Sequence, residues 1–313
     1  MATPSPAPNA LAQEPIEYDY EGLAPGTSLG ANLAAGAFAG IMEHTVMYPV
    51  DAIKVTRLQV ISPSPGAVYN SMGNAAARMF QREGLRSMWR GVNSVILGAG
   101  PAHAVYFATY EGAKELLGAT SSTEHHILET ATAGALATMA SDALMNPFDV
   151  VKQRLQLHDS TYRGSIDCAA TMYRTEGLRS FFISYPATIC MTIPFAAIQF
   201  AAYDSFSKIF NPSGSYDPLK HSIVGGLAGS LGAVLTNPLD VVKTLLQTRG
   251  SSPDPRIRSC NGLWDATKLV YQLEGYRGFG RGMIPRTVNI APSTAICWMS
   301  YEMARHYLIK SPE

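Results

Sequence analysis

The chain has few charged residues, few cysteines and no net charge. Only 15% of its 313 residues are Asp, Glu, Lys or Arg, whereas soluble domains average about 25%. Four cysteines without a C-x-x-C pair argue against a disulfide scaffold and a zinc ribbon. The balance of 24 basic and 24 acidic residues gives no sign of nucleic-acid binding. Hydrophobic residues make up 47%, which excludes a disordered chain.

Strong hydropathy peaks are also missing, since the mean hydropathy is only +0.04. Long stretches without Asp, Glu, Lys or Arg nevertheless occur, at residues 91–110, 184–203 and 222–239. Each is about as long as a helix that crosses roughly 30 Å of hydrocarbon. Three further stretches are interrupted by charge or shorter, at 29–53, 130–151 and 287–301. Gly, Ser, Thr and Asn in all six favour membrane helices around a wet cavity; the alternative is a soluble protein with buried apolar helices.

One motif occurs three times. It reads PVDAIKVTRLQ at 49–59, PFDVVKQRLQ at 147–156 and PLDVVKTLLQ at 238–247. A second block follows each copy: EGLRSMWRG at 83–91, EGLRSFFIS at 176–184 and EGYRGFGRG at 274–282. Recurrence in the same order predicts three copies of about 95 residues, each with two spanning helices. We expect a disordered acidic tail at 1–28, followed by repeats at 29–120, 121–213 and 214–313.

The prolines and the charges that follow them predict how the repeats meet. Pro49, Pro147 and Pro238 should kink their helices, which a membrane tolerates where the break faces protein or water. Charges near the bilayer centre are costly and should pair. Around a threefold ring the expected pairs are Asp51 with Lys152, Asp149 with Lys243, and Asp240 with Lys54. The residues placed to brace the pairs are Gln59, Gln156 and Gln247, of which Gln59 lies one residue later in its motif.

The tripled P-x-[DE]-x-x-[KR] motif and the later acidic-Gly pair resemble the mitochondrial solute carriers over about residues 30–310. The resemblance implies an all-α membrane protein with six transmembrane helices in three pseudo-threefold repeats. It also implies a short matrix-side helix in each repeat, a central substrate site, alternating access, no enzymatic activity and no permanent cofactor. The six residues of the three expected Asp–Lys pairs then form a gate on the matrix side, which we call the matrix gate. A second family motif, an aromatic residue and an acid followed by a base, predicts an outer gate formed by Glu111, Lys114, Asp204, Glu302 and Arg305.

Charge asymmetry predicts the orientation in the mitochondrial inner membrane. The loops within each helix pair are rich in Lys and Arg, whereas the first 53 residues contain neither. The positive-inside trend then places the basic loops in the matrix and both termini toward the intermembrane space. Bases near the expected short helices, at about 72–83, 165–176 and 262–274, could hold cardiolipin as a structural lipid; a solvated basic face is the alternative. We expect a monomer.

The level expected to line the cavity has no Lys or Arg and is rich in metal-binding groups. His44 and Asp142 stand five residues before their kink prolines, and Met191 stands thirteen residues before Asp204. A carrier of anions would need Arg or Lys here. Imidazole, carboxylate and thioether groups together suit a divalent transition metal. The residues expected along this path are His44, Gly98, His103, Asp142, Met191, Thr192, His221 and Ala291.

The stretches HTVMYPVDAIK (44–54), GAGPAHAVYF (98–107), MTIPFAAIQF (191–200) and APSTAICWMSYE (291–302) resemble the mitoferrin subfamily of iron carriers. The resemblance implies functional roles for His44, His103 and His221, and it implies import of Fe2+ for haem and iron–sulfur synthesis. The subfamily's Met-Asn pair is Met191-Thr192 here. Two alternatives stay open: a carrier of a cationic or neutral organic solute such as S-adenosylmethionine, and a non-transporting carrier homologue. Selectivity among iron, copper, manganese and zinc is also open.

Overall fold

The computed structural model describes most of the chain between residues 29 and 296, and no strand occurs in the part that it describes. The described residues are 29–53, 77, 80–81, 84, 89–118, 127–157, 160–210, 218–290, 292–293 and 296. The predicted tail at 1–28 lies outside them. So do five predicted site residues: Lys54, Gln59, Ala291, Glu302 and Arg305.

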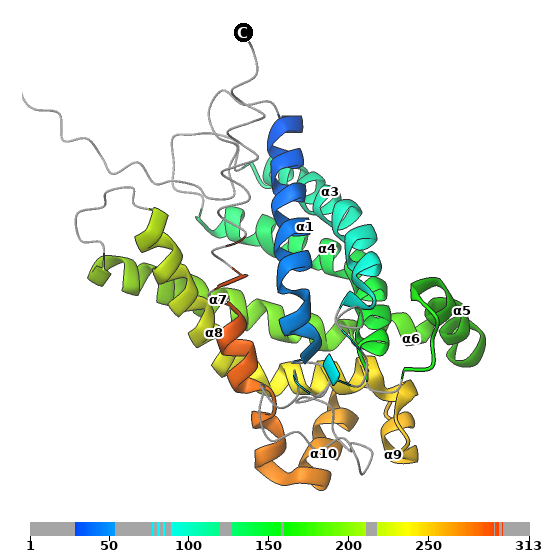
Figure 1. Ribbon diagram of the computed structural model, residues 1–313. Helices are drawn as coiled ribbons and strands as arrows, with labels where there is room; N and C mark the ends of the chain where they lie inside the picture. The colour runs from blue at the N-terminus through cyan, green and yellow to red at the C-terminus, as the bar shows by residue number, and fades with distance from the viewer. Residues whose placement is uncertain are drawn as a thin grey trace, which may run out of the picture.

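Five long helices occur within these ranges, and residues 283–290 begin a further one (Figure 1). The odd helices, which carry the kink prolines, are α1 (Leu29–Ile53), α4 (Ile127–Leu155) and α8 (Pro218–Thr248). The even helices are α3 (Val92–Leu116) and α7 (Tyr185–Phe210). Every repeat therefore contributes one odd helix and the whole or the beginning of one even helix.

Short helices connect the members of the second and third pairs. The segments predicted at 165–176 and 262–274 correspond to α5 (Ser165–Glu176) and α10 (Leu263–Glu274). Four shorter elements lie beside them: α6 (Arg179–Phe182), α9 (Pro255–Arg258), η3 (Arg249–Ser251) and η4 (Gly275–Gly280). The segment predicted at 72–83 lies mostly outside the described residues.

The repeated Glu-Gly pair ends the short helices for a conformational reason. Gly177 follows α5 with φ 76°, and Gly275 follows α10 with φ 63°. Gly84, at the corresponding place in the first repeat, has φ 77°. Positive φ is costly for residues that carry a Cβ, so glycine is the residue that permits this turn.

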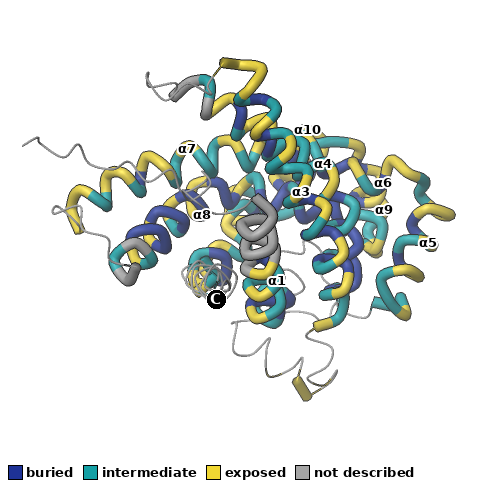
Figure 2. Tube along the Cα trace, turned by 90° about the horizontal axis from the view of Figure 1, so that it is seen from above, coloured by how far each residue is buried: buried dark blue, intermediate teal, exposed yellow. Residues whose placement is uncertain are grey.

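Neighbouring long helices pack in chain order. α1 packs on α3, α3 lies along α4, and α7 lies along α8. Figure 2 shows α1 nearly end-on, with α3 and α4 to one side of it and α7 and α8 to the other. Residues 283–290 connect the two sides, because Ser230 of α8 donates to the Thr287 carbonyl at 3.4 Å and Asn289 donates to Asp51 of α1 at 2.7 Å.

Prolines interrupt both kinds of long helix. Pro49, Pro147 and Pro238 lie inside α1, α4 and α8, as the motif predicts. Pro101 inside α3 and Pro194 inside α7 form a second set, each nine residues before the tyrosine of the outer-gate motif. A proline removes one main-chain hydrogen bond, so each long helix has a defined weak point.

The residue before each kink proline ties its helix to the segment that leads into the next even helix. In all three repeats a side-chain group donates to a main-chain carbonyl in that segment. The contacts are Tyr48 to Arg90 at 2.8 Å, Asn146 to Phe181 at 2.5 Å and Asn237 to Phe279 at 2.7 Å. These tethers hold the two helices of a repeat together on the side of the short helices.

Buried apolar clusters fill the contact between the short helices and the odd helices. Leu155 of α4 packs with Cys168 and Met172 of α5. Leu246 of α8 packs with Val270 of α10. Fully burying one such Leu, Val or Met side chain contributes about 1.5–3 kcal/mol, so this end of each repeat is a stable unit.

Two of the described helical stretches are long and apolar enough to cross a membrane. They are Arg179–Phe210 and Ser222–Ser251, in which an 18-residue segment has a mean hydropathy of 1.6 and 1.3, respectively. They contain two of the uncharged stretches, 184–203 and 222–239. The third, at 91–110, lies in α3 and the last residue before it, and is less apolar.

Substitution of Gly98 tests whether α3 approaches α4 closely. A Cβ added at Gly98 would lie 2.7 Å from Cγ of Phe148 and 2.9 Å from Sδ of Met145. We expect Gly98→Ala to destabilise the protein by about 1–3 kcal/mol, the usual cost of overpacking. At Gly100 a Cβ meets nothing within 4 Å, so Gly100→Ala should leave the melting temperature unchanged or slightly higher. Thermal unfolding in detergent checks both, and equal melting temperatures would contradict the contact.

Candidate functional site

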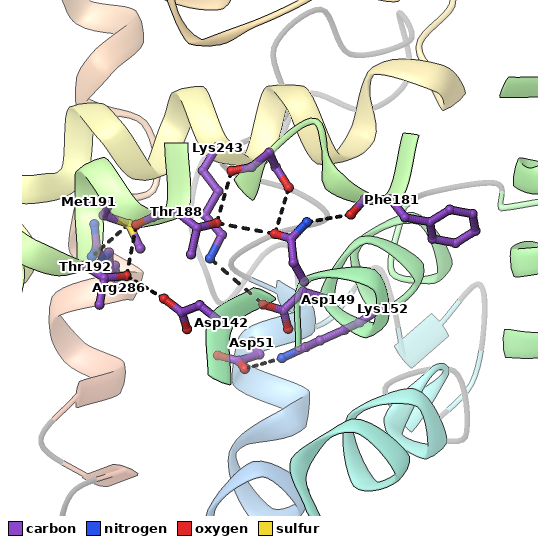
Figure 3. A network of polar contacts seen from close by, with 12 residues as sticks. Asp51, Asp142, Asp149, Lys152, Phe181, Thr188, Met191, Thr192, Lys243 and Arg286 are labelled. Carbon is purple, nitrogen blue, oxygen red and sulfur yellow. Dashed lines mark hydrogen bonds and ion pairs between the residues drawn. The ribbon is translucent and has the colours of Figure 1, made fainter. Parts of the chain in front are cut away.

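An acidic side chain of the first repeat and a lysine of the second meet near the ends of α1 and α4. Lys152 Nζ lies 3.0 Å from Asp51 Oδ2 (Figure 3). Lys152 is only 8% exposed, and its ammonium lies over the Tyr48 ring, 5.2 Å from the centroid. Asp51 also accepts the hydrogen bond from Asn289. The contact predicted between these two repeats is present and mostly buried, while its role as a gate stays a prediction.

The other predicted contacts of the matrix gate differ from this one. Lys243 Nζ of α8 lies 4.0 Å from Asp149 Oδ2 of α4, so that pair is looser. The predicted partner of Asp240 is Lys54, which lies outside the described residues. Within those residues, Arg286 Nε lies 3.6 Å from Asp240 Oδ2. Because Arg286 and Asp240 belong to the same repeat, this contact is a new one within the third repeat.

Of the predicted glutamine braces, the two that the structure describes do not form as predicted. The carboxamides of Gln156 and Gln247 are buried, and they make no hydrogen bond to the described Asp–Lys pairs. Instead, the main-chain carbonyl of Gln247 accepts from Nε of Arg154 at 3.1 Å. An arginine reaching across from α4 therefore connects the second and third repeats at the place where a glutamine side chain was expected to act.

Arg154 also holds α5 in place. It is fully buried, its Nη2 lies 2.8 Å from Oε2 of Glu176, and its Nη1 contacts the other carboxylate oxygen. Such two-pronged pairs are the strongest arginine–carboxylate contacts. In the third repeat Leu245 stands at the place of Arg154, and Glu274 pairs with Arg281 instead, at 2.5 Å. The second and third repeats thus pair the equivalent glutamate, Glu176 or Glu274, with arginines at different positions of the repeat.

The predicted ligands of the second repeat lie together between α4 and α7. The Thr192 hydroxyl lies 3.2 Å from Asp142 Oδ2 and 2.9 Å from the Thr188 carbonyl. Met191 precedes Thr192 on the same helix, and its Sδ lies 3.7 Å from Nη2 of Arg286. Figure 3 shows this carboxylate, hydroxyl and thioether in one network with the matrix-gate residues. This group offers oxygen and sulfur atoms.

The predicted histidines of the first repeat lie between α1 and α3. His103 of α3 packs against Gly40 of α1, where an added Cβ would lie 3.0 Å from Nε2. His44 stands about one turn after Gly40, and His103 is within electrostatic reach of His44 and Glu43. Glu43 accepts a hydrogen bond from Ser293. The predicted ligands thus form two groups, with nitrogen on the first repeat and with oxygen and sulfur on the second.

The remaining path residues contribute no described ligand. Gly98 packs against Phe148 of α4, so its position is a helix contact and not a cavity wall as expected. His221 lies near the start of α8, and its side chain is outside the described part. Among the side chains that the structure does describe, no three of His, Cys, Asp or Glu come close enough together to hold a metal ion.

At the other end of α3 and α7, the acids of the predicted outer gate are exposed. Asp204 pairs with Lys208 one turn along its own helix, at 2.7 Å. Exposed pairs of this kind contribute only about 0.3–0.5 kcal/mol, so Asp204 can exchange partners at little cost. Glu111 is exposed, and Lys114 lies over the Tyr110 ring, 4.9 Å from the centroid. The predicted partners, Arg305 for Asp204 and Glu302 for Lys114, lie outside the described residues. The family motif predicts no partner for Glu111.

The profile of the family described as mitochondrial carrier protein matches the chain three times, at residues 26–121, 123–214 and 214–312. The chain belongs to the mitochondrial carrier family. It is 48% identical over 294 residues to an uncharacterised mitochondrial carrier of Schizosaccharomyces pombe, covering 94% of this chain and 96% of that one. It is 46% identical to mitochondrial RNA-splicing protein MRS4 of Saccharomyces cerevisiae, covering 94% and 97%. It is 45% identical to Mitoferrin-1 of Homo sapiens, covering 93% and 87%.

This carrier contains one buried arginine that motif spacing does not reveal. Spacing assigns Arg286 to the basic loop after α8, yet residues 283–290 are helical, so it stands inside the sixth helix. There it is 7% exposed and lies beside Met191. The stretches 92–110 and 184–203 contain no Lys or Arg, but Arg286 brings a guanidinium beside Met191 from residues 283–290. The sequence signal that could have located Arg286 is Gly282, the last residue of the repeated block. The even helix begins directly after it, so Arg286 lies in the first turn of that helix.

Reversing the Asp149–Lys243 pair tests whether the matrix gate is an electrostatic contact between repeats. Asp149→Lys and Lys243→Asp should each destabilise the carrier, because like charges then face each other at about 4 Å. The cost should lie between the about 1 kcal/mol of exposed pairs and the about 3–5 kcal/mol of fully buried ones. The double variant should regain most of the loss in a thermal-unfolding assay. A double variant no more stable than the singles would exclude the pairing.

Proposed function

We propose that this carrier transports ferrous iron across the mitochondrial inner membrane into the matrix, where iron supplies haem and iron–sulfur cluster synthesis. The observation that carries the proposal is its 45% identity to Mitoferrin-1 of Homo sapiens over 93% of the chain. The chemistry of the two ligand groups supports it. His44 and His103 offer nitrogen, Met191 offers sulfur and Asp142 offers oxygen, a combination suited to a divalent transition metal.

We place six helices across the membrane, with both termini toward the intermembrane space. Large apolar side chains on the long helices point outward, as lipid-facing residues do: Leu97 is 64% exposed, Phe200 66% and Leu235 57%. Trp264 and Tyr276, beside the short helices, are each 81% exposed. Exposed Trp and Tyr are typical of the membrane–water interface, which supports assigning the short helices to the matrix surface.

Transport proceeds by alternating access between two gates. The described conformation has the Asp51–Lys152 pair made, which corresponds to a carrier closed toward the matrix. The ion enters from the intermembrane space and binds the two ligand groups, and its binding energy offsets breaking the pairs of the matrix gate. The outer gate then forms, with Asp204 exchanging Lys208 for its predicted partner Arg305. Ligands drawn from two groups release the ion more readily than a closed metal cage would.

The membrane potential supplies the driving force. Two positive charges moving inward gain about 2.3 kcal/mol per charge for each 100 mV, which is about 7 kcal/mol at roughly 150 mV. The sequence contains no G-x-x-x-x-G-K-[ST] loop that would indicate use of ATP. We propose that the carrier acts as a monomeric uniporter, and we expect no permanent cofactor.

Cardiolipin is the structural lipid that we expect at the matrix surface. Gly164 and Gly262 are the N-cap residues of α5 and α10, and neither provides a side-chain hydrogen bond to its helix. Main-chain amides at a helix start favour phosphate groups. These two helix starts are therefore the positions at which we place the phosphates of the lipid.

Radioactive iron uptake into liposomes that contain the purified carrier tests the function. With a potential negative inside, we expect uptake of Fe2+ by the wild type. We expect the initial rate to fall at least several-fold in His44→Ala and in Met191→Ala, because each removes one ligand. Met283→Ala provides a matched control, since Met283 is 37% exposed and is not one of the predicted path residues. Its rate should equal that of the wild type.

The result that would overturn the proposal is uptake of an organic solute without uptake of iron. S-adenosylmethionine is the solute to include, because Asp142 and Glu43 could balance its positive charge. Equal rates in the two ligand variants and the Met283 control would show that the metal binds at other residues. Extending the panel to copper, manganese and zinc defines the selectivity.

A further inference from the structure

Arg286 joins three elements in the interior of the carrier. It stands on the helical residues 283–290 and is 7% exposed. Its Nη2 lies 3.0 Å from Oγ1 of Thr236 on α8 and 3.7 Å from Sδ of Met191 on α7. Its Nε lies 3.6 Å from Asp240, and the guanidinium lies over the Phe195 ring, 5.8 Å from the centroid. One cation thus contacts both a predicted metal ligand and a matrix-gate carboxylate.

The hydrogen bonds of this guanidinium are incomplete. Nη2 serves both Thr236 and Met191, while Nη1 is buried without a hydrogen-bond partner in the described structure. A buried donor without a partner is destabilising, and a thioether is a weak acceptor. The position beside Met191 is therefore one that the guanidinium can leave, whereas Asp240 offers a stronger, charge-assisted bond.

A metal ion and Arg286 compete for Met191. The thioether lone pair that faces Nη2 is the same kind of donor that binds a transition metal. A divalent cation at the sulfur would also repel the positively charged guanidinium at short range. The ion therefore binds Met191 fully only after Arg286 has moved away from the sulfur, and the partner already at hand is Asp240.

We infer that Arg286 is a positioning residue that couples occupancy of the metal site to the matrix gate. In the empty carrier it rests against Met191. When the ion binds, Arg286 shifts onto Asp240 and occupies a carboxylate that the closed gate uses, which favours opening of the gate. This inference rests on the proposed iron transport and acts through Met191, since Arg286 itself does not touch the ion.

Uptake kinetics of Fe2+ in liposomes containing the full-length carrier test the inference. In Arg286→Gln the competitor for Met191 loses its charge, so KM should fall at least threefold. The maximal rate should also fall at least threefold, because residue 286 then has no charge with which to compete for Asp240 against the gate. In the Met191→Leu background the same Arg286 change should leave KM unaltered. Arg277→Gln removes an exposed arginine from the preceding segment, and it should match the wild type in both parameters.

KM separates this role from a structural one, because loss of folded protein lowers the maximal rate without changing KM. Should Arg286→Gln fail to fold, Arg286→Lys carries the test. Lysine keeps the charge for Asp240 but lacks the fork that reaches Met191, so KM should fall while the maximal rate stays close to that of the wild type.

An unchanged KM in the variant that folds, or an equal KM shift with and without Met191, would overturn the inference while leaving iron transport intact. Absence of Fe2+ uptake by the wild type would instead contradict the proposed function.

Discussion

The buried contact between Asp51 and Lys152 is the interaction on which the rest of the structure depends. It joins the first repeat to the second through two charges with little exposure to water. Unit charges 4 Å apart attract by about 4 kcal/mol at an effective dielectric constant near 20. In the proposed alternating-access mechanism, opening toward the matrix separates such pairs, so the cargo must provide interactions of similar strength. The ligand groups beside the matrix gate are placed where binding can do so.

The remaining contacts at the same end make each repeat rigid. Asn146 and Asn237 tie the kinked helices to the segments that lead into the even helices, and Arg154 fixes α5 through Glu176. Hydrophobic clusters fill the space between short and odd helices. Since these contacts lie largely within repeats, the contacts between repeats are the ones that can change without disrupting the core. Movement is thereby directed to the charged contacts of the matrix gate.

Sequence reasoning succeeded where a feature repeats. The three copies of the motif located the kink prolines, the bounds of α5 and the Asp51–Lys152 contact, because each follows from spacing along a helix. It failed where several neighbouring groups could make the same contact. Arg154, and not a glutamine side chain, bridges α4 and α8, and Arg286 enters the interior because its helix begins four residues earlier than the charge pattern indicated. Such choices depend on the rotation and close approach of helices, which spacing alone does not determine.

In the proposed mechanism the cargo crosses as a bare divalent cation, and the charge that it carries can be measured directly. In liposomes whose potential is set with potassium and valinomycin, the potential at which net iron flux vanishes should shift with the iron gradient. For two charges moved per iron, the shift is roughly 30 mV for each tenfold change in concentration ratio, from the two-charge Nernst slope. A null potential that follows this slope supports the account. A flux of iron that does not respond to voltage, or a slope of about 59 mV, would contradict it.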